Sequence, residues 1–159
     1  MREDEKDQSD QVRPLSTRLE KKLEKISELL ERLALQSAKG IPIVVEGPND
    51  AKTLRNLALC GEIIVAKTKK SFLALATEIE KLGVEEVILL MDFDRRGKEW
   101  TKRLTRYLEQ TSTKPNTFFW TELHDLMGRE LKDIESLVSF IHTLKKKSRN
   151  SQTIIESKM

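Results

Sequence analysis

The ten residues IPIVVEGPND, at positions 41–50, decide the fold that this sequence predicts. An apolar run at 41–45 has the length of a buried strand and stops abruptly at Glu46 and Gly47. Glycine and proline directly after such a run are typical of a sharp turn. The stretch therefore ends a buried strand by presenting two carboxylates, those of Glu46 and Asp50, to one small region of space.

A second stretch further along the chain has the same form. The run VILLM at 87–91 is wholly apolar, and Asp92 and Asp94 follow it directly. Side chains two positions apart on an extended segment point the same way, so these two carboxylates should share a face. Gly97 then allows the backbone to turn sharply or to approach a ligand closely.

The rest of the chain alternates apolar runs with helical patterns. Continuous apolar strands separated by helices predict an α/β fold with a four-stranded, mostly parallel sheet flanked by helices. Ligands of such sheets bind where the strands deliver their C-terminal ends, which is where the carboxylates lie. The strands are expected at 41–45, 62–66, 87–91 and 117–120, and helices at 49–59, at 71–82, around Trp100 to Leu108, and at 123–144 with an interruption near Gly128.

An additional amphipathic helix precedes this domain. Its apolar residues recur at spacings of four and three, which suits packing on the chain's own domain but also a partner helix or self-association through residues 15–33. The apolar positions are Leu15, Leu19, Leu23, Ile26, Leu30 and Leu33. The predicted organisation is a disordered tail at 1–14, this helix at 15–39, the α/β domain at 40–144 and a flexible basic tail at 145–159.

Composition excludes several classes of protein. With 38% hydrophobic and 35% charged residues the sequence is typical of a soluble globular domain, and the single cysteine, Cys60, excludes an internal disulfide. No apolar run is long enough to span a membrane, and the N-terminus is polar, so we expect a cytoplasmic protein. Of the net charge of +3, residues 1–13 contribute −2 and residues 145–159 contribute +4. The remaining +1 for the domain neither favours nor excludes nucleic-acid binding, so only local basic clusters could indicate it.

Several carboxylates at one sheet edge repel each other unless a cation lies between them. Magnesium suits the arrangement better than calcium, because it is held by one or two carboxylates while it keeps waters and accepts substrate phosphates. An alternative interpretation is that acids at helix starts, such as Asp50, act only as helix caps.

At these residues the sequence resembles the TOPRIM family, the catalytic domain of topoisomerases, bacterial-type primases and certain nucleases. "VEGPND" is similar to its first motif and "LLMDFDRRG" to its second, and the likeness is closest to small stand-alone archaeal proteins. The resemblance implies that Glu46 acts as general acid or base or as a metal ligand, and that Asp92 and Asp94 hold Mg²⁺, with Mn²⁺ as a possible substitute. Gly47 and Gly97 are its structural glycines, and Asp50, Lys132 and Asp133 are further candidates. Pro48 stands where a basic residue is frequent, which puts a phosphate contact there in doubt.

The resemblance implies an activity on nucleic acid. A topoisomerase needs a tyrosine nucleophile, whereas Tyr107 lies within a predicted helix, and a primase needs elements for which this chain has no room. Two hypotheses follow: a magnesium-dependent nuclease that acts on RNA or DNA in RNA processing or DNA repair, or a non-catalytic nucleic-acid-binding module that docks a partner through its N-terminal helix. The candidate phosphate-binding residues are Lys67, Lys69, Lys70, Arg95, Arg96 and Lys98.

Overall fold

A four-stranded parallel sheet forms the centre of the molecule. The computed structural model describes residues 17–127 and 131–158, and side chains only as far as residue 146. The strand order is β2-β1-β3-β4, and every neighbouring pair is parallel, which confirms the predicted α/β fold. The strands are β1 Ile43–Val45, β2 Ile63–Val65, β3 Glu86–Leu90 and β4 Lys114–Asn116.

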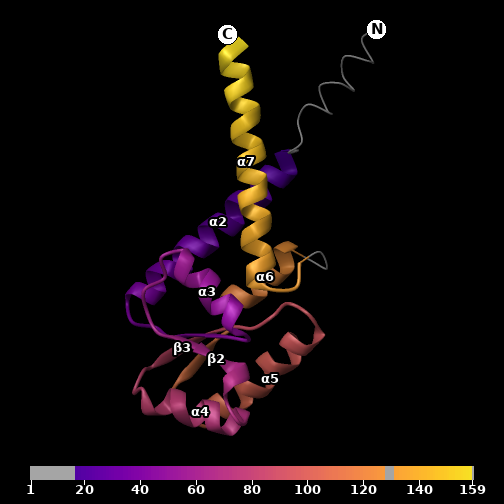
Figure 1. The fold of residues 1–159 in the computed structure, drawn as a ribbon. Helices are drawn as coiled ribbons and strands as arrows, with labels where there is room; N and C mark the ends of the chain where they lie inside the picture. The colour runs from indigo at the N-terminus through magenta and orange to yellow at the C-terminus, as the bar shows by residue number, and fades with distance from the viewer. Residues whose placement is uncertain (1–16, 128–130, 159) are drawn as a thin grey trace.

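Helices cover both faces of the sheet (Figure 1). On one face lie α4, Phe72–Lys81, and α5, Arg95–Glu109, which pack against each other. The opposite face carries α2, Thr17–Ala38, together with α3, Pro48–Asn56, and α6, Phe118–Met127. The last helix, α7, Ile134–Lys158, begins against α3 and rises away from the sheet. In the part of the chain that the structure describes, no helix combines the length and the apolar character needed to cross a membrane.

The local sequence explains where these elements begin and end. The central strands β1 and β3 are apolar and almost wholly buried, as strands covered on both faces must be. The side chain of Ser71 accepts a hydrogen bond from the Ala74 N–H and so caps the start of α4. Gly83 follows the end of α4 with a φ of +68°, a conformation that favours glycine.

The N-terminal helix packs on its own domain. Three residues of α2, namely Ile26, Leu29 and Leu33, are buried in the common core, and α2 lies against α6. The end of α2 is also tied to the loop before β2, because the Gly61 N–H donates a hydrogen bond of 3.0 Å to the Ser37 hydroxyl. Of the two interpretations of this helix, packing on the chain's own domain is therefore confirmed for its buried residues. Leu15 lies outside the described residues.

The predicted position of the fourth strand is wrong. The fourth strand was expected at 117–120, but β4 covers the polar residues Lys114–Asn116, and 118–127 form α6. β4 is an edge strand, where Pro115 is tolerated, and the aromatic residues that follow it pack on the core from a helix. Helix α7 continues through Lys158, and the flexibility predicted for residues 145–159 stays a prediction. Residues 1–14, and the interruption predicted near Gly128, lie outside the described residues.

Candidate functional site

The glutamate that follows β1 is completely buried. Because β1 lies between β2 and β3, Glu46 sits at the middle of the C-terminal edge of the sheet. Its side chain is 0% exposed, and its Oε2 accepts a hydrogen bond of 3.0 Å from Nη2 of Arg96 in the first turn of α5. The other oxygen, Oε1, is buried without a hydrogen-bond partner among the described residues. A buried carboxylate oxygen without a donor is costly, so this atom points to a missing ligand or proton.

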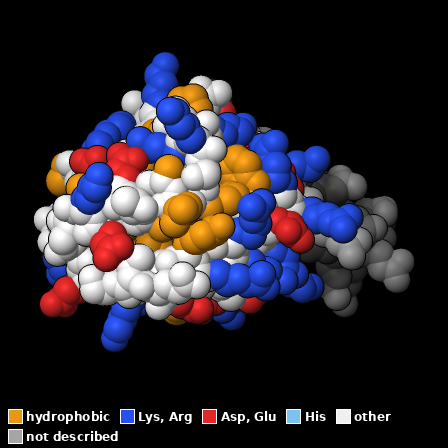
Figure 2. All heavy atoms as spheres, turned by 90° about the horizontal axis from the view of Figure 1, so that it is seen from below, with side chains coloured by type: hydrophobic (Ala, Val, Ile, Leu, Met, Phe, Trp, Pro, Cys, Tyr) orange, Lys and Arg blue, Asp and Glu red, His pale blue; other side chains and the backbone are white. Residues whose placement is uncertain are grey.

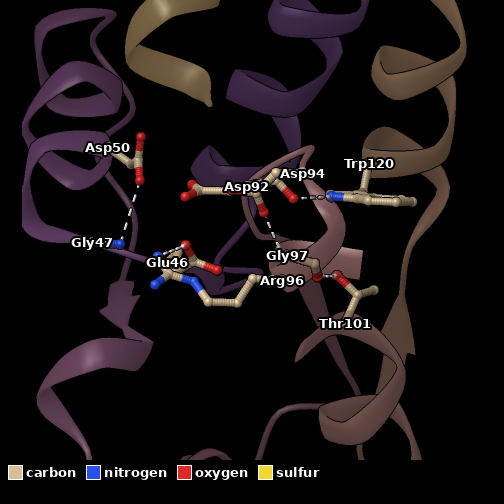
Figure 3. Close-up of polar contacts among 9 residues, drawn as sticks. All are labelled: Glu46, Gly47, Asp50, Asp92, Asp94, Arg96, Gly97, Thr101 and Trp120. Atoms are coloured by element: carbon tan, nitrogen blue, oxygen red, sulfur yellow. Dashed lines mark hydrogen bonds and ion pairs between the residues drawn. The ribbon is translucent and has the colours of Figure 1, made fainter. Parts of the chain in front are cut away.

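Asp92 follows β3, and its backbone is held on two sides. The Trp120 indole N–H donates a hydrogen bond of 3.1 Å to the Asp92 carbonyl, and the Phe93 N–H donates one of 2.5 Å to the Lys132 carbonyl. The ring of Phe93 is buried and packs beside Trp120 with 6.2 Å between ring centroids. These contacts fix the path of the segment that follows β3. Glu46, Asp50 and Asp92 lie in one region beyond the C-terminal ends of β1 and β3 (Figure 3).

The environment of Asp92 disfavours its charged form. Burial, hydrogen bonding to Glu46 and the negative charges of Glu46, Asp50 and Asp94 together raise the pKa of Asp92 to about 8. Two ionised carboxylates can only accept hydrogen bonds, whereas a proton on Asp92 makes it the donor that Glu46 lacks. At neutral pH the carboxyl of Asp92 therefore keeps its proton far more readily than an ordinary aspartate does.

Asp94 is turned toward α5 and caps that helix. Its Oδ1 accepts a hydrogen bond of 2.8 Å from the Gly97 N–H (Figure 3). A Cβ on Gly97 would lie 1.8 Å from the Asp92 carbonyl oxygen, so only glycine fits there. Gly47 is different: it has a φ of −125°, and the nearest atom to an added Cβ would be 3.8 Å away. Glycine is therefore required on steric grounds at Gly97 but not at Gly47.

Asp50 and Asp133 extend the acidic region. Asp50 is buried, and its Oδ2 accepts a hydrogen bond of 3.3 Å from the Gly47 N–H, as a helix cap does. Burial raises the pKa of Asp50, and the charges of Asp133 and Glu46 act in the same direction. Asp133 itself caps α7 by accepting a hydrogen bond of 2.7 Å from the Ser136 N–H. Both residues thus have a structural role beside the site.

The predicted phosphate-binding residues divide into three groups. Arg96 is engaged with Glu46, and Lys69 forms an ion pair of 2.9 Å with Glu78 of α4. Lys67 follows β2, and its Nζ lies 3.9 Å from the position that a Cβ on Gly47 would take, so it is beside the first motif. The others are exposed, with no ion pair to a described residue: Lys70, Arg95 and Lys98.

The residues present fit a cation held by two carboxylates. The unpartnered Oε1 of Glu46 and the raised pKa of Asp92 are both features that a positive ion between these groups would relieve. Within residues 17–127 and 131–158, no three acidic, histidine or cysteine side chains are arranged as a complete metal cluster. Asp94, the third predicted ligand, is occupied at Oδ1 by the helix cap.

This geometry agrees with what comparison with known proteins shows. Residues 41–126 match the sequence profile of the Toprim domain, and this span holds both acidic motifs. The chain belongs to the Toprim domain family. The Toprim resemblance predicted from the two motifs is thereby confirmed.

Its relatives with a Toprim domain include small archaeal proteins. A UPF0292 protein of Methanosarcina acetivorans is 37% identical over 128 residues, which cover 80% of this chain and 88% of the relative. The UPF0292 protein of Methanocaldococcus jannaschii is 38% identical over 120 residues, covering 75% and 91%. A solved structure of a putative protein from Aquifex aeolicus superposes with a TM-score of 0.56 at 26% identity, over 62% of this chain and 88% of the other.

Sequence reasoning missed two aromatic residues of the Toprim site. Trp120 fixes the Asp92 carbonyl from α6, but it was assigned to a strand, and a contact across 28 positions leaves no local signal. Trp100 lies under the guanidinium of Arg96, whose carbon is 5.4 Å from the ring centroid. This second contact could have been found, because residues four apart on a helix are neighbours.

Proposed function

We propose that this Toprim domain is a magnesium-dependent nuclease that cleaves nucleic-acid phosphodiesters, in RNA processing or DNA repair. The observation that carries the proposal is the buried Glu46, which has one oxygen without a donor and faces an Asp92 whose pKa is raised to about 8. Such perturbed carboxylates in one place are typical of sites that hold a cation or move a proton. Toprim domains typically bind Mg²⁺ through acidic residues, which agrees with this assignment.

Each residue has a role that its position supports. Glu46 and Asp92 would hold Mg²⁺, with Mn²⁺ as a substitute, and Asp94 would join them on the side not used by the helix cap. The bound cation would polarise the phosphodiester and stabilise the charge that develops on the leaving oxygen. Glu46, with a free Oε1, is placed to accept or return a proton. Lys67 and Arg96 border the carboxylates and supply positive charge for the phosphate.

The test is cleavage of labelled RNA and DNA panels in Mg²⁺ or Mn²⁺. We expect cleavage by the unmodified chain and a loss of at least a hundredfold in Glu46→Gln and in Asp92→Asn, as for groups that act directly in the reaction. Glu62→Gln is the matched control, because Glu62 is an exposed acid at the opposite end of β2. Equal cleavage by all three variants would show that the activity comes from a contaminant or from another site.

One observation favours a second candidate, a non-catalytic nucleic-acid-binding module. The ion pair with Arg96 occupies Oε2 of Glu46, so a cation must compete with an arginine for this carboxylate. A module of this kind would bind nucleic acid without cleaving it, and would dock a partner through the N-terminal helix. Since the buried side of α2 is used within the chain, a partner would have to meet its outer side, where Leu35 is 62% exposed. Binding without cleavage in the same panels supports this alternative.

A further inference from the structure

The face formed by α4 and α5 combines apolar and basic side chains. Seen from this side, the molecule shows an apolar patch in the middle, with lysine and arginine side chains around it (Figure 2). On α4, Leu73 is 60% exposed and Phe72 is partly buried. On α5, four residues at spacings of four, three and four form what we call the α5 stripe: Arg96, Trp100, Arg103 and Tyr107.

Aromatic rings and guanidinium groups alternate along this stripe. The rings of Phe72 and Trp100 meet edge to face with 5.4 Å between centroids. The guanidinium carbon of Arg103 lies 4.7 Å from the Phe72 ring centroid, and that of Arg96 lies 5.4 Å from the Trp100 ring centroid. These are cation–π contacts, in which the arginine covers a ring face and keeps its N–H donors available.

Ion pairs among the described residues leave much of the positive charge of this face unneutralised. Helix α5 carries six basic and two acidic residues. Arg103 and Arg106 have no ion pair with any residue that the structure describes, and together with Tyr107 and Gln110 they line a shallow hollow. Unpaired arginines beside aromatic rings are complementary to a ligand that has both phosphates and flat, stackable groups.

The stripe starts at the carboxylates. Arg96 contacts Trp100 on one side and the buried Glu46 on the other, so that the first residue of the stripe is also part of the candidate site. From Arg96 to Tyr107 the helix rises roughly 16 Å, which is long enough to lie beside more than one nucleotide of an extended strand. A strand bound along the stripe would therefore lead directly to Glu46 and Asp92.

We propose that the α5 stripe, with Phe72 beside it, binds a single-stranded segment of nucleic acid and directs it to the carboxylates. This inference rests on the proposed function, since it names the form of the substrate. Aromatic faces favour a single strand because its bases are free to stack on them, whereas the bases of a duplex already stack on each other. Arg103 and Arg106 then contact phosphates, and Trp100 and Phe72 contact bases.

Binding is tested apart from cleavage by fluorescence anisotropy in EDTA. The probes are a short labelled oligouridylate, the equivalent oligothymidylate and a duplex of the same length. We expect both single strands to bind more tightly than the duplex, and Trp100→Ala and Arg103→Ala each to weaken that binding about tenfold. Lys102→Ala is the matched control, because it removes the same charge from the exposed position next to Arg103 and should change affinity less than twofold. If Trp100→Ala lowers the stability of the fold, the comparison of Arg103→Ala with Lys102→Ala alone decides the test.

The outcomes separate this inference from the proposed nuclease. Single-strand binding that depends on Arg103, in a protein that cleaves nothing in Mg²⁺, supports the stripe and removes the nuclease. Equal affinities of Arg103→Ala and Lys102→Ala, tighter binding of the duplex, or no binding of any probe would overturn the stripe even if cleavage is observed. Binding of an acidic protein in place of the oligonucleotides would also overturn it.

Discussion

Arg96 reaches from the first turn of α5 to the carboxylate of Glu46, fifty positions earlier in the chain, and joins the two acidic motifs with an ion pair of 3.0 Å. The side chain of Glu46 is completely buried, while that of Arg96 is 53% exposed. The arginine therefore neutralises a charge that water cannot reach, and can still turn toward solvent. Whether Oε2 of Glu46 is available to a cation therefore depends on whether Arg96 stays in this ion pair.

Removal of this arginine should expose the cost of the buried charge. In Arg96→Ala, Oε2 of Glu46 loses its partner and is left unpaired like Oε1, so we expect the free energy of unfolding at pH 8 to fall by about 2 kcal/mol. The adjacent Arg95→Ala, which removes an exposed arginine, should change it by less than about 0.5 kcal/mol. Urea denaturation measures both. A double variant Arg96→Ala/Glu46→Gln that is no more stable than Arg96→Ala alone would contradict this account.

Gly97 should tolerate no side chain. A Cβ at this position would lie 1.8 Å from the Asp92 carbonyl oxygen, so Gly97→Ala must displace the segment after β3. We expect a loss of about 3 kcal/mol of stability and a lower affinity for Mn²⁺. Gly47→Ala is the comparison, since its nearest atom would be 3.8 Å away, and its Tm in a thermal melt should be nearly unchanged. Similar losses in the two variants would rule out the steric explanation.

The stability of the metal-free protein should fall as the pH rises. The pKa of Asp92 is about 8 in the folded chain and about 3.9 when unfolded, so the folded state binds more protons between these values. Stability from this group is fully present below about pH 4 and is lost as the pH rises toward 8. Asp92→Asn should reduce this slope and, allowing for partial exposure of Asp92, stabilise the metal-free chain at pH 9 by about 1 to 2 kcal/mol. Urea denaturation from pH 5 to 9 with EDTA makes the comparison, and an unchanged slope in Asp92→Asn would count against the raised pKa. The raised pKa of Asp50 leaves a smaller slope of the same sign in both proteins.

A divalent cation should stabilise the protein through the same two carboxylates. Mn²⁺ neutralises the repulsion between Glu46 and Asp92, so it should raise Tm in the unmodified chain and more at pH 8 than at pH 6, where Asp92 holds its proton more tightly. Glu46→Gln and Asp92→Asn should abolish the increase, whereas Glu62→Gln should retain it. Isothermal titration calorimetry provides an independent measure, and uptake of Mn²⁺ by both site variants would place the cation elsewhere.

Trp120 should position Asp92 through one hydrogen bond. Trp120→Phe removes the indole N–H that holds the Asp92 carbonyl but keeps a ring between Phe93 and His124. We expect stability to fall by about 1 kcal/mol and Mn²⁺ affinity to fall with it. Thr113→Val is the control, because it removes a 2.9 Å hydrogen bond to the Val84 carbonyl before β3, far along the strand from Asp92, and should leave Mn²⁺ affinity unchanged. A loss of stability without a loss of Mn²⁺ affinity would make Trp120 a purely structural residue.

Short-range patterns predicted most of the fold. The apolar runs that became β1, β2 and β3 are bounded by turn residues, and the predicted helices 49–59 and 71–82 agree with α3 and α4 to within a few residues. The position of the fourth strand was wrong because a short run of three aromatic residues, Phe118 to Trp120, fits a strand and the first turn of a helix equally well. Only the pairing of the polar residues at 114–116 with β3 decides the matter, and that contact is distant in sequence.

The candidate site was likewise predictable where it depends on local sequence, and not where it depends on distant contacts. The acids at the strand ends could be predicted, because parallel strands deliver them to one edge. Their individual states could not, since the complete burial of Glu46, its unpartnered Oε1 and its ion pair with Arg96 of α5 depend on contacts that are distant in the sequence. Likewise, Lys69 and Arg96 have the same charge in the sequence, but one pairs with Glu78 and the other with Glu46.

The all-parallel sheet also constrains how this chain can fold during its synthesis on the ribosome. Ile43 of β1 pairs with Ile63 on one side and Ile88 on the other, which are 20 and 45 positions later, and no strand can pair by a simple hairpin. Each pairing must close a long loop before it gains any stability, so assembly should be slow for a chain of this size. During synthesis, Glu46 stays exposed to water until Asp92 and the start of α5 have left the exit tunnel. The two acidic motifs can therefore reach their folded arrangement only together.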